Sequence, residues 1–72
     1  MYGIYKTMGS GYPTKVDGAL DLQDAKNKLA GWADAESNAG ATVQWDRRAG
    51  LIVGQFTSFH DNITARFFGA PL

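Results

Sequence analysis

The first residues of the chain alternate with the two-residue period of a β-strand. Residues 2–8 divide between two faces, with Tyr2, Ile4, Lys6 and Met8 on one and Gly3, Tyr5 and Thr7 on the other. Gly9-Ser10-Gly11 is expected to end this strand. Residues 12–16 are expected to return as a short edge strand, where Pro13 is tolerated only at the start or on an outer edge.

A helical period follows at residue 21. Three- and four-residue spacing places on one stripe Leu22, Ala25, Leu29, Trp32, Ala33 and Glu36. Asp21 can cap the first turn, and Asn38 and Gly40 suit the left-handed residue that often ends a helix. Glu36 is the one charged member of the stripe. Gly31 is interpreted as tolerated rather than required for contact with the sheet, although glycine costs about 1 kcal/mol relative to alanine inside a helix.

Three further strands are predicted after the helix. Residues 41–46 alternate as a half-buried strand, and residues 46–50 form a hairpin loop with a late glycine. Residues 51–59 are the longest apolar segment and lack clean alternation, which predicts a central strand that is apolar on both faces. Residues 60–62 form a tight turn, and residues 63–68 alternate again as a closing strand.

These elements predict a single α+β domain over residues 1–72. One amphipathic helix packs on a three- to four-stranded, mostly antiparallel sheet in two layers, and the order is strand, helix and three strands. One helix covers only one face of such a sheet, so the other face is expected to remain free.

Composition narrows the location and the class of protein. The 72 residues are 44% hydrophobic, which is enough for one core, and they include no cysteine for a disulfide framework or a thiolate metal site. The first residues lack the pattern of a signal peptide, and no apolar segment is long enough to cross a bilayer. A cytoplasmic location is therefore expected. Seven basic and seven acidic residues cancel, which argues against strong non-specific attraction to nucleic acid and against an acidic mimic of it.

No residue set in the sequence predicts catalysis. His60 is the only histidine, and its neighbours Thr57, Ser58 and Asp61 lie too close in sequence to converge on a substrate from separate elements. We interpret this segment as a solvated turn, so the chain is not expected to be an enzyme.

Metal and nucleotide sites are not predicted either. The acids at positions 17, 21 and 24 do not have the spacing of a calcium loop, and helix capping and solubility account for them. The glycines at positions 9, 11 and 18 lack the lysine and hydroxyl partners of a phosphate-binding loop. We expect no cofactor.

The free face of the sheet is the candidate site. Period-two alternation places there Tyr5, Gln44, Val53, Arg66 and Phe68. Aromatic and arginine side chains are common at the energetic centres of protein interfaces. The predicted partner-binding residues are Tyr5, Arg47, Arg48, Arg66 and Phe68.

Three alternatives to a partner-binding surface remain open. Tyr5 and Phe68 can simply shield one another as cross-strand neighbours. The face can instead stack single-stranded bases, with phosphates near Lys6, Arg47, Arg48 and Arg66. It can also close a homodimer that buries Leu51 and Val53.

The order of elements, together with the helix opening at residues 20–30, LDLQDAKNKLA, resembles small phage-encoded accessory proteins, including some anti-CRISPR inhibitors. The resemblance covers most of the chain as architecture and only the helix opening as sequence. It implies a non-catalytic inhibitor of phage or mobile-element origin that occludes a surface of a host defence complex. No motif residues transfer from these proteins, and the neutral charge departs from those members that mimic DNA.

Overall fold

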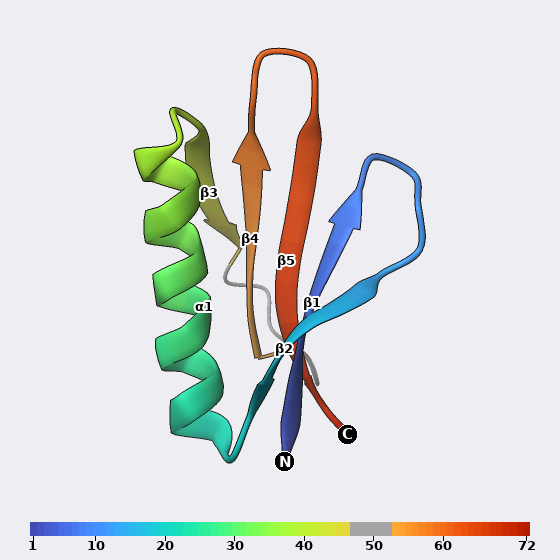
Figure 1. Cartoon of the computed structure of the whole chain (residues 1–72), viewed down its shortest axis with the longest axis vertical. Helices are drawn as coiled ribbons and strands as arrows, with labels where there is room; N and C mark the ends of the chain where they lie inside the picture. The colour runs from blue at the N-terminus through green and yellow to red at the C-terminus, as the bar shows by residue number, and fades with distance from the viewer. Residues whose placement is uncertain (47–52) are drawn as a thin grey trace.

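Five antiparallel strands and one helix make up the part of the chain that the structure describes. The computed structural model describes residues 1–46 and 53–72, and at Val53 it describes the backbone only. The elements are β1 (Tyr2–Met8), β2 (Thr14–Ala19), α1 (Leu22–Asn38), β3 (Thr42–Asp46), β4 (Val53–Phe59) and β5 (Thr64–Pro71). The strands lie in the order β2-β1-β5-β4-β3, and α1 packs along one side of the sheet (Figure 1). The α+β class and the two layers are confirmed.

Helix α1 begins and ends where the sequence predicts. The Asp21 side chain accepts a hydrogen bond from the backbone N–H of Asp24 at 2.8 Å, which satisfies one of the free amides of the first turn. The predicted left-handed residue is Gly40, with a φ of 96°, while Asn38 remains helical. Ala25, Leu29 and Ala33 of the predicted stripe are buried against the sheet.

The core lies between α1 and one face of the sheet. Phe56 of β4 and Phe67 of β5 are fully buried and stack with ring centroids 4.7 Å apart. Ile4 and Leu29 close the core from β1 and α1. Burying a side chain of this size contributes about 1.5–3 kcal/mol. The alternation along each strand therefore points the remaining side chains to the opposite face, which no helix of the described chain covers.

The sheet has five strands, whereas three to four were predicted. The segment that we expected at residues 12–16 forms β2 two residues later and continues to Ala19, paired along the outer edge of β1. Pro13 precedes the strand, as its missing N–H requires. The pairing has a bulge opposite Ile4 and Tyr5, where Val16 is the additional residue of β2. Val16 packs against the core.

The strand at the centre of the sheet is β5, not the apolar segment at residues 51–59. Within that segment, residues 51 and 52 lie outside the described residues, and β4 is an interior strand with polar Gln55 and Thr57 on its free face. Gly54, with a φ of 57°, shifts the register and explains the missing alternation. The closing strand continues to Pro71 because residues 69–71 pair with β1.

Candidate interaction surface

The face of the sheet opposite α1, here called the open face, carries two rows of side chains that cross the strands. The first row runs through Asp46, Gln55, Phe68, Tyr5 and Lys15. The second row runs through Gln44, Thr57, Arg66 and Thr7. The predicted placement of Tyr5, Gln44, Arg66 and Phe68 on this face is confirmed, and the side chain of Val53 lies outside what the structure describes.

Tyr5 and Phe68 form a flat aromatic pair at the middle of the open face, which we call the aromatic plate. Their ring centroids are 5.4 Å apart with an angle of 19° between the planes. A Cβ atom on Gly3 would lie 2.9 Å from the Tyr5 ring, so the ring rests over this glycine. The two rings shield one another, as the simpler interpretation of the sequence expected, and both remain only half-buried.

Arg66 lies beside the aromatic plate. Its side chain is exposed, and its cross-strand neighbours are Thr7 on β1 and Thr57 on β4. Within residues 1–46 and 53–72, no hydrogen bond or ion pair holds its guanidinium group. A cavity of about 270 Å³ adjoins it, lined by Thr7, Gly11, Pro13, Gln55, Arg66 and Phe68. A charged group on the central strand is therefore available to a ligand.

The structure describes one of the other predicted cations, Lys6, and places it away from Arg66. Arg47 and Arg48 lie outside the described residues. Lys6, which the nucleic-acid alternative set near the phosphates together with Arg66, lies on the helix side of β1. Its Nζ atom lies 5.3 Å from the centroid of the Phe67 ring, where it contributes a cation–π contact to the core.

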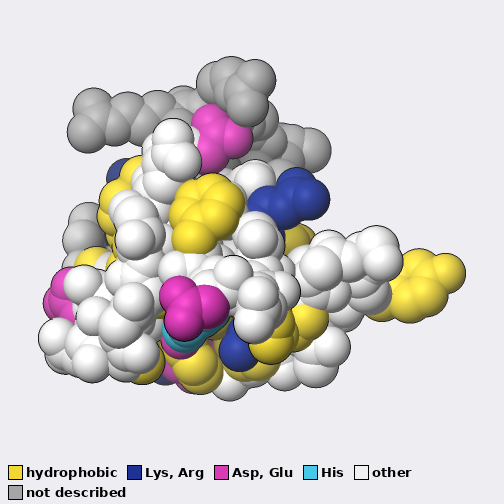
Figure 2. Space-filling model, turned by 90° about the horizontal axis from the view of Figure 1, so that it is seen from above, with side chains coloured by type: hydrophobic (Ala, Val, Ile, Leu, Met, Phe, Trp, Pro, Cys, Tyr) yellow, Lys and Arg dark blue, Asp and Glu magenta, His cyan; other side chains and the backbone are white. Residues whose placement is uncertain are grey.

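The loop between β1 and β2 is a second exposed feature, which the sequence prediction missed. This loop projects to the right of the molecule in both views (Figures 1 and 2). Tyr12 is 94% exposed and Met8 is 46% exposed. Gly11 lines the cavity beside Arg66 and also a cavity of about 330 Å³ next to Lys6 and Tyr12. The available signal was an aromatic residue between a Gly-rich turn and a proline.

His60 is engaged in a structural contact rather than a catalytic relay. Its Nε2 atom lies 3.3 Å from the Ser58 Oγ and 3.3 Å from the Glu36 Oε1. A nucleophile relay needs the two ring nitrogens to serve different partners, and here one nitrogen faces both. Ser58 is also 0% exposed, so no substrate reaches it. The contact explains Glu36 in the helical stripe, which sequence patterns missed because the two residues are 24 positions apart.

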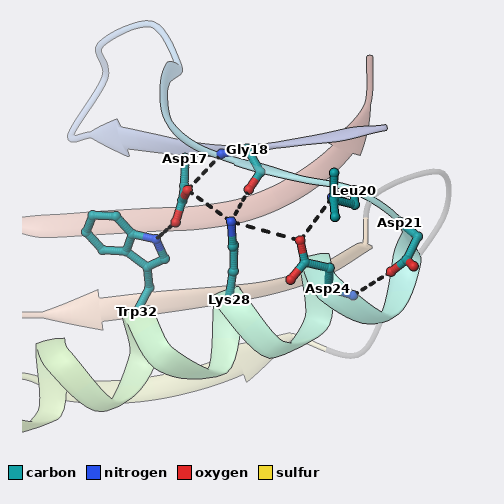
Figure 3. Close-up of polar contacts among 7 residues, drawn as sticks. All are labelled: Asp17, Gly18, Leu20, Asp21, Asp24, Lys28 and Trp32. Atoms are coloured by element: carbon teal, nitrogen blue, oxygen red, sulfur yellow. Dashed lines mark hydrogen bonds and ion pairs between the residues drawn. The ribbon is translucent and has the colours of Figure 1, made fainter.

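A polar network joins β2 to α1 (Figure 3). Asp17 accepts hydrogen bonds from the Gly18 backbone N–H at 2.9 Å and from the Trp32 indole at 3.3 Å. The Lys28 Nζ donates a hydrogen bond to the Gly18 carbonyl at 2.6 Å. The same nitrogen lies 3.5 Å from the Asp17 Oδ1 and 3.9 Å from the Asp24 Oδ2. The Gly18 N–H lowers the pKa of Asp17 below its ordinary value, and Trp32 and Lys28 add to this effect.

This network explains the acids near the helix start. Asp21 caps the helix, while Asp17 and Asp24 both pair with Lys28. No group of three or more metal-binding side chains occurs in the described parts of the chain. A cavity of about 500 Å³ lies beside the network, lined in part by Lys28, Gly31 and Trp32. Three of its polar side chains, Asp17, Lys28 and Trp32, already bind one another, so the open face is the better candidate site.

Helix α1, the helix of the described chain, is too short, at 17 residues, and carries too many charged side chains to cross a membrane.

The resemblance to phage accessory proteins stays a prediction. No family model, curated protein or solved structure matches this chain.

Proposed function

We propose that this protein is a non-catalytic protein-binding module whose open sheet face contacts its partner. The observation that carries the proposal is the aromatic plate of Tyr5 and Phe68 on the face that α1 leaves uncovered, next to Arg66, which is unpaired within residues 1–46 and 53–72. Tyrosine and arginine are among the residue types that dominate binding energy at protein interfaces.

The rigidity of this face supports the proposal. Tyr5, Phe68 and Arg66 lie on β1 and β5, which pair over seven residue positions, and the Tyr5 ring is held against Gly3 and Phe68. Side chains that are already ordered lose less conformational entropy when a partner binds. A partner that covers this plate therefore gains apolar burial at a low entropic cost.

The narrower form of the proposal is an inhibitor that acts in the host cytoplasm by occluding a surface of a defence complex. It rests on the architectural resemblance to phage accessory proteins and on the absence of cysteine. Restoration of phage infection in a defended bacterial strain that expresses the chain tests this form. Unchanged resistance in strains that carry each type of defence complex would reject it.

The test of the general proposal compares matched variants in a pull-down. Tagged wild type, Phe68→Ala and Arg66→Gln are expressed in bacteria, and captured proteins are quantified after nuclease treatment. Lys26→Gln is the control, because Lys26 is exposed on α1, away from the open face. We expect a stoichiometric partner that Phe68→Ala loses and Lys26→Gln retains. Equal capture by all variants would reject the open face as the binding surface.

Nucleic acid is the second candidate, because a flat aromatic pair beside an arginine can also stack a base next to a phosphate. Capture that disappears with nuclease, and binding that weakens steeply with added salt, would favour it.

If the open face instead closes a homodimer, light scattering at micromolar concentration should give twice the mass of one chain, and Phe68→Ala should restore the mass of the monomer. The nuclease and salt tests thus distinguish nucleic-acid binding, and light scattering distinguishes the homodimer, from binding to another protein.

A further inference from the structure

We infer that the cavity beside Arg66 binds a carboxylate of the partner, supplied by an Asp or Glu side chain next to an apolar residue. The inference rests on the proposed function and deepens it by naming the chemistry of the partner. The argument rests on the guanidinium group, which is unpaired among the described residues, on the polar residues Thr7 and Gln55 in the same cavity, and on the aromatic side chain that lines it.

The surroundings of Arg66 suit a small planar anion. Its cross-strand neighbours are Thr7 on β1 and Thr57 on β4, and Thr7 also lines the cavity. Gln55 contributes an amide to the wall of the cavity. A carboxylate that enters this site can accept two parallel hydrogen bonds from the guanidinium and further bonds from the hydroxyl and amide donors.

The charge of the open face favours an acidic partner. Its charged side chains in the described strands are Lys15, Arg66 and Asp46. Asp46 has an interaction of its own and lies on β3, two strands away from β5. Arg66 therefore has no compensating anion beside it within the described chain, although the chain as a whole has no net charge.

A carboxylate fits this arrangement better than a nucleic-acid backbone. Binding to nucleic acid gains most of its strength from several cations that neutralise successive phosphates. On the open face the described strands supply Arg66 and Lys15, and Lys6 lies on the opposite side. A guanidinium that shares one cavity with Thr7 and Gln55 matches one bidentate partner rather than a polyanion.

The apolar part of the cavity defines the residue next to the carboxylate. Phe68 lines the cavity and belongs to the aromatic plate, while Gly11 and Pro13 line it from the loop between β1 and β2. An aromatic or aliphatic side chain adjacent to the acid can lie on the plate while the carboxylate reaches Arg66. The predicted recognition unit is therefore one acidic residue flanked by apolar residues.

The test uses two short peptides and nuclear magnetic resonance of the isotopically labelled chain. Acetyl-Phe-Glu-Phe-amide is titrated against its neutral counterpart acetyl-Phe-Gln-Phe-amide, and the Arg66 side-chain N–H and the Thr7, Gln55 and Phe68 amides are followed. We expect saturable shifts with the Glu peptide and about tenfold weaker binding of the Gln peptide. Arg66→Gln should bind both peptides equally weakly, and Lys26→Gln, on the exposed side of α1, should behave as wild type.

Equal binding of the two peptides, absence of saturation with the Glu peptide, or full binding by Arg66→Gln would overturn the inference. Tight, salt-sensitive binding of a short oligothymidylate in place of the Glu peptide would overturn it in favour of nucleic acid. The pull-down distinguishes a failure of the carboxylate inference from a failure of the proposed function. Capture lost in Phe68→Ala but complete in Arg66→Gln retains the proposed function and rejects the carboxylate, while capture complete in both rejects the function.

Discussion

Two consecutive phenylalanines on β5 show how different the two faces of the sheet are. Phe67 is fully buried against α1 and contacts Phe56, Trp32 and Lys6. Phe68 points to the open face, is half-buried, and stacks on Tyr5. One peptide bond thus separates a side chain that holds the fold together from one that is available to a partner, because successive side chains on a strand point in opposite directions.

Together with the proposed function, this comparison predicts that stability and binding are divided between the two faces. Changes on the helix side are expected to alter the free energy of unfolding and leave partner capture intact. Changes on the open face are expected to weaken partner capture and to lower the free energy of unfolding by less. The following predictions test this division.

The largest loss of free energy of unfolding is expected when Phe67 is substituted. Phe67→Ala should lower the free energy of unfolding by about 3–5 kcal/mol, because it leaves a cavity in the core. Phe68→Ala should cost about 1–2 kcal/mol, from the lost stacking and partial burial. Urea denaturation followed by circular dichroism measures both. If Phe67→Ala does not fold, Phe67→Leu serves as the milder core variant. Equal losses at the two positions would remove the distinction between the faces.

The helix cap is expected to have the next largest effect. Asp21→Ala removes the acceptor for the Asp24 N–H and should cost about 1 kcal/mol of stability. Asp34→Ala, on the exposed side of α1, is the matched control and should be nearly neutral. Both variants should capture the partner as wild type does once folded. A cap variant that binds less while remaining folded would show that α1 takes part in the interface.

Gly31 offers a gain of stability on the helix side. An added Cβ meets no atom within 4 Å, so the structure agrees with the interpretation that this glycine is tolerated rather than required. Gly31→Ala should raise the free energy of unfolding by about 0.4–1 kcal/mol, since alanine loses less backbone entropy in a helix. Thermal and urea midpoints measure the gain. A loss of stability would show that the helix needs glycine there.

The smallest effect is expected for Asp17 and depends on pH. Its pKa is lowered in the folded chain, first by the Gly18 N–H, so its stabilising contribution is complete above the unfolded pKa and is lost as pH falls through the folded pKa. The side chain is 36% exposed, so solvent weakens the contribution. Wild type should therefore lose slightly more stability than Asp17→Asn when the pH is lowered through the acidic range. Identical pH profiles would contradict this role.

Much of the fold could be predicted because its signals are local. The Asp21 cap, the buried stripe of Ala25, Leu29 and Ala33, and the alternation around Tyr5 each depend on neighbours within one or two turns or strand positions. The pair of Glu36 and His60 could not be predicted, because it joins residues far apart in the sequence. The extension of β5 through residues 69–71 was also hidden, since it depends on pairing with β1 rather than on strand-forming residues.

The candidate site divides in the same way. The sequence by itself determined that aromatic residues and Arg66 share one face, because alternation along a strand is a local property. Only the tertiary structure decided that β5 lies between β1 and β4, which brings Tyr5 onto Phe68 and sets Arg66 between Thr7 and Thr57. It also placed the rim of the β1–β2 loop beside Arg66. Strand order depends on which pairing buries the most apolar surface under α1, and that competition involves the whole chain.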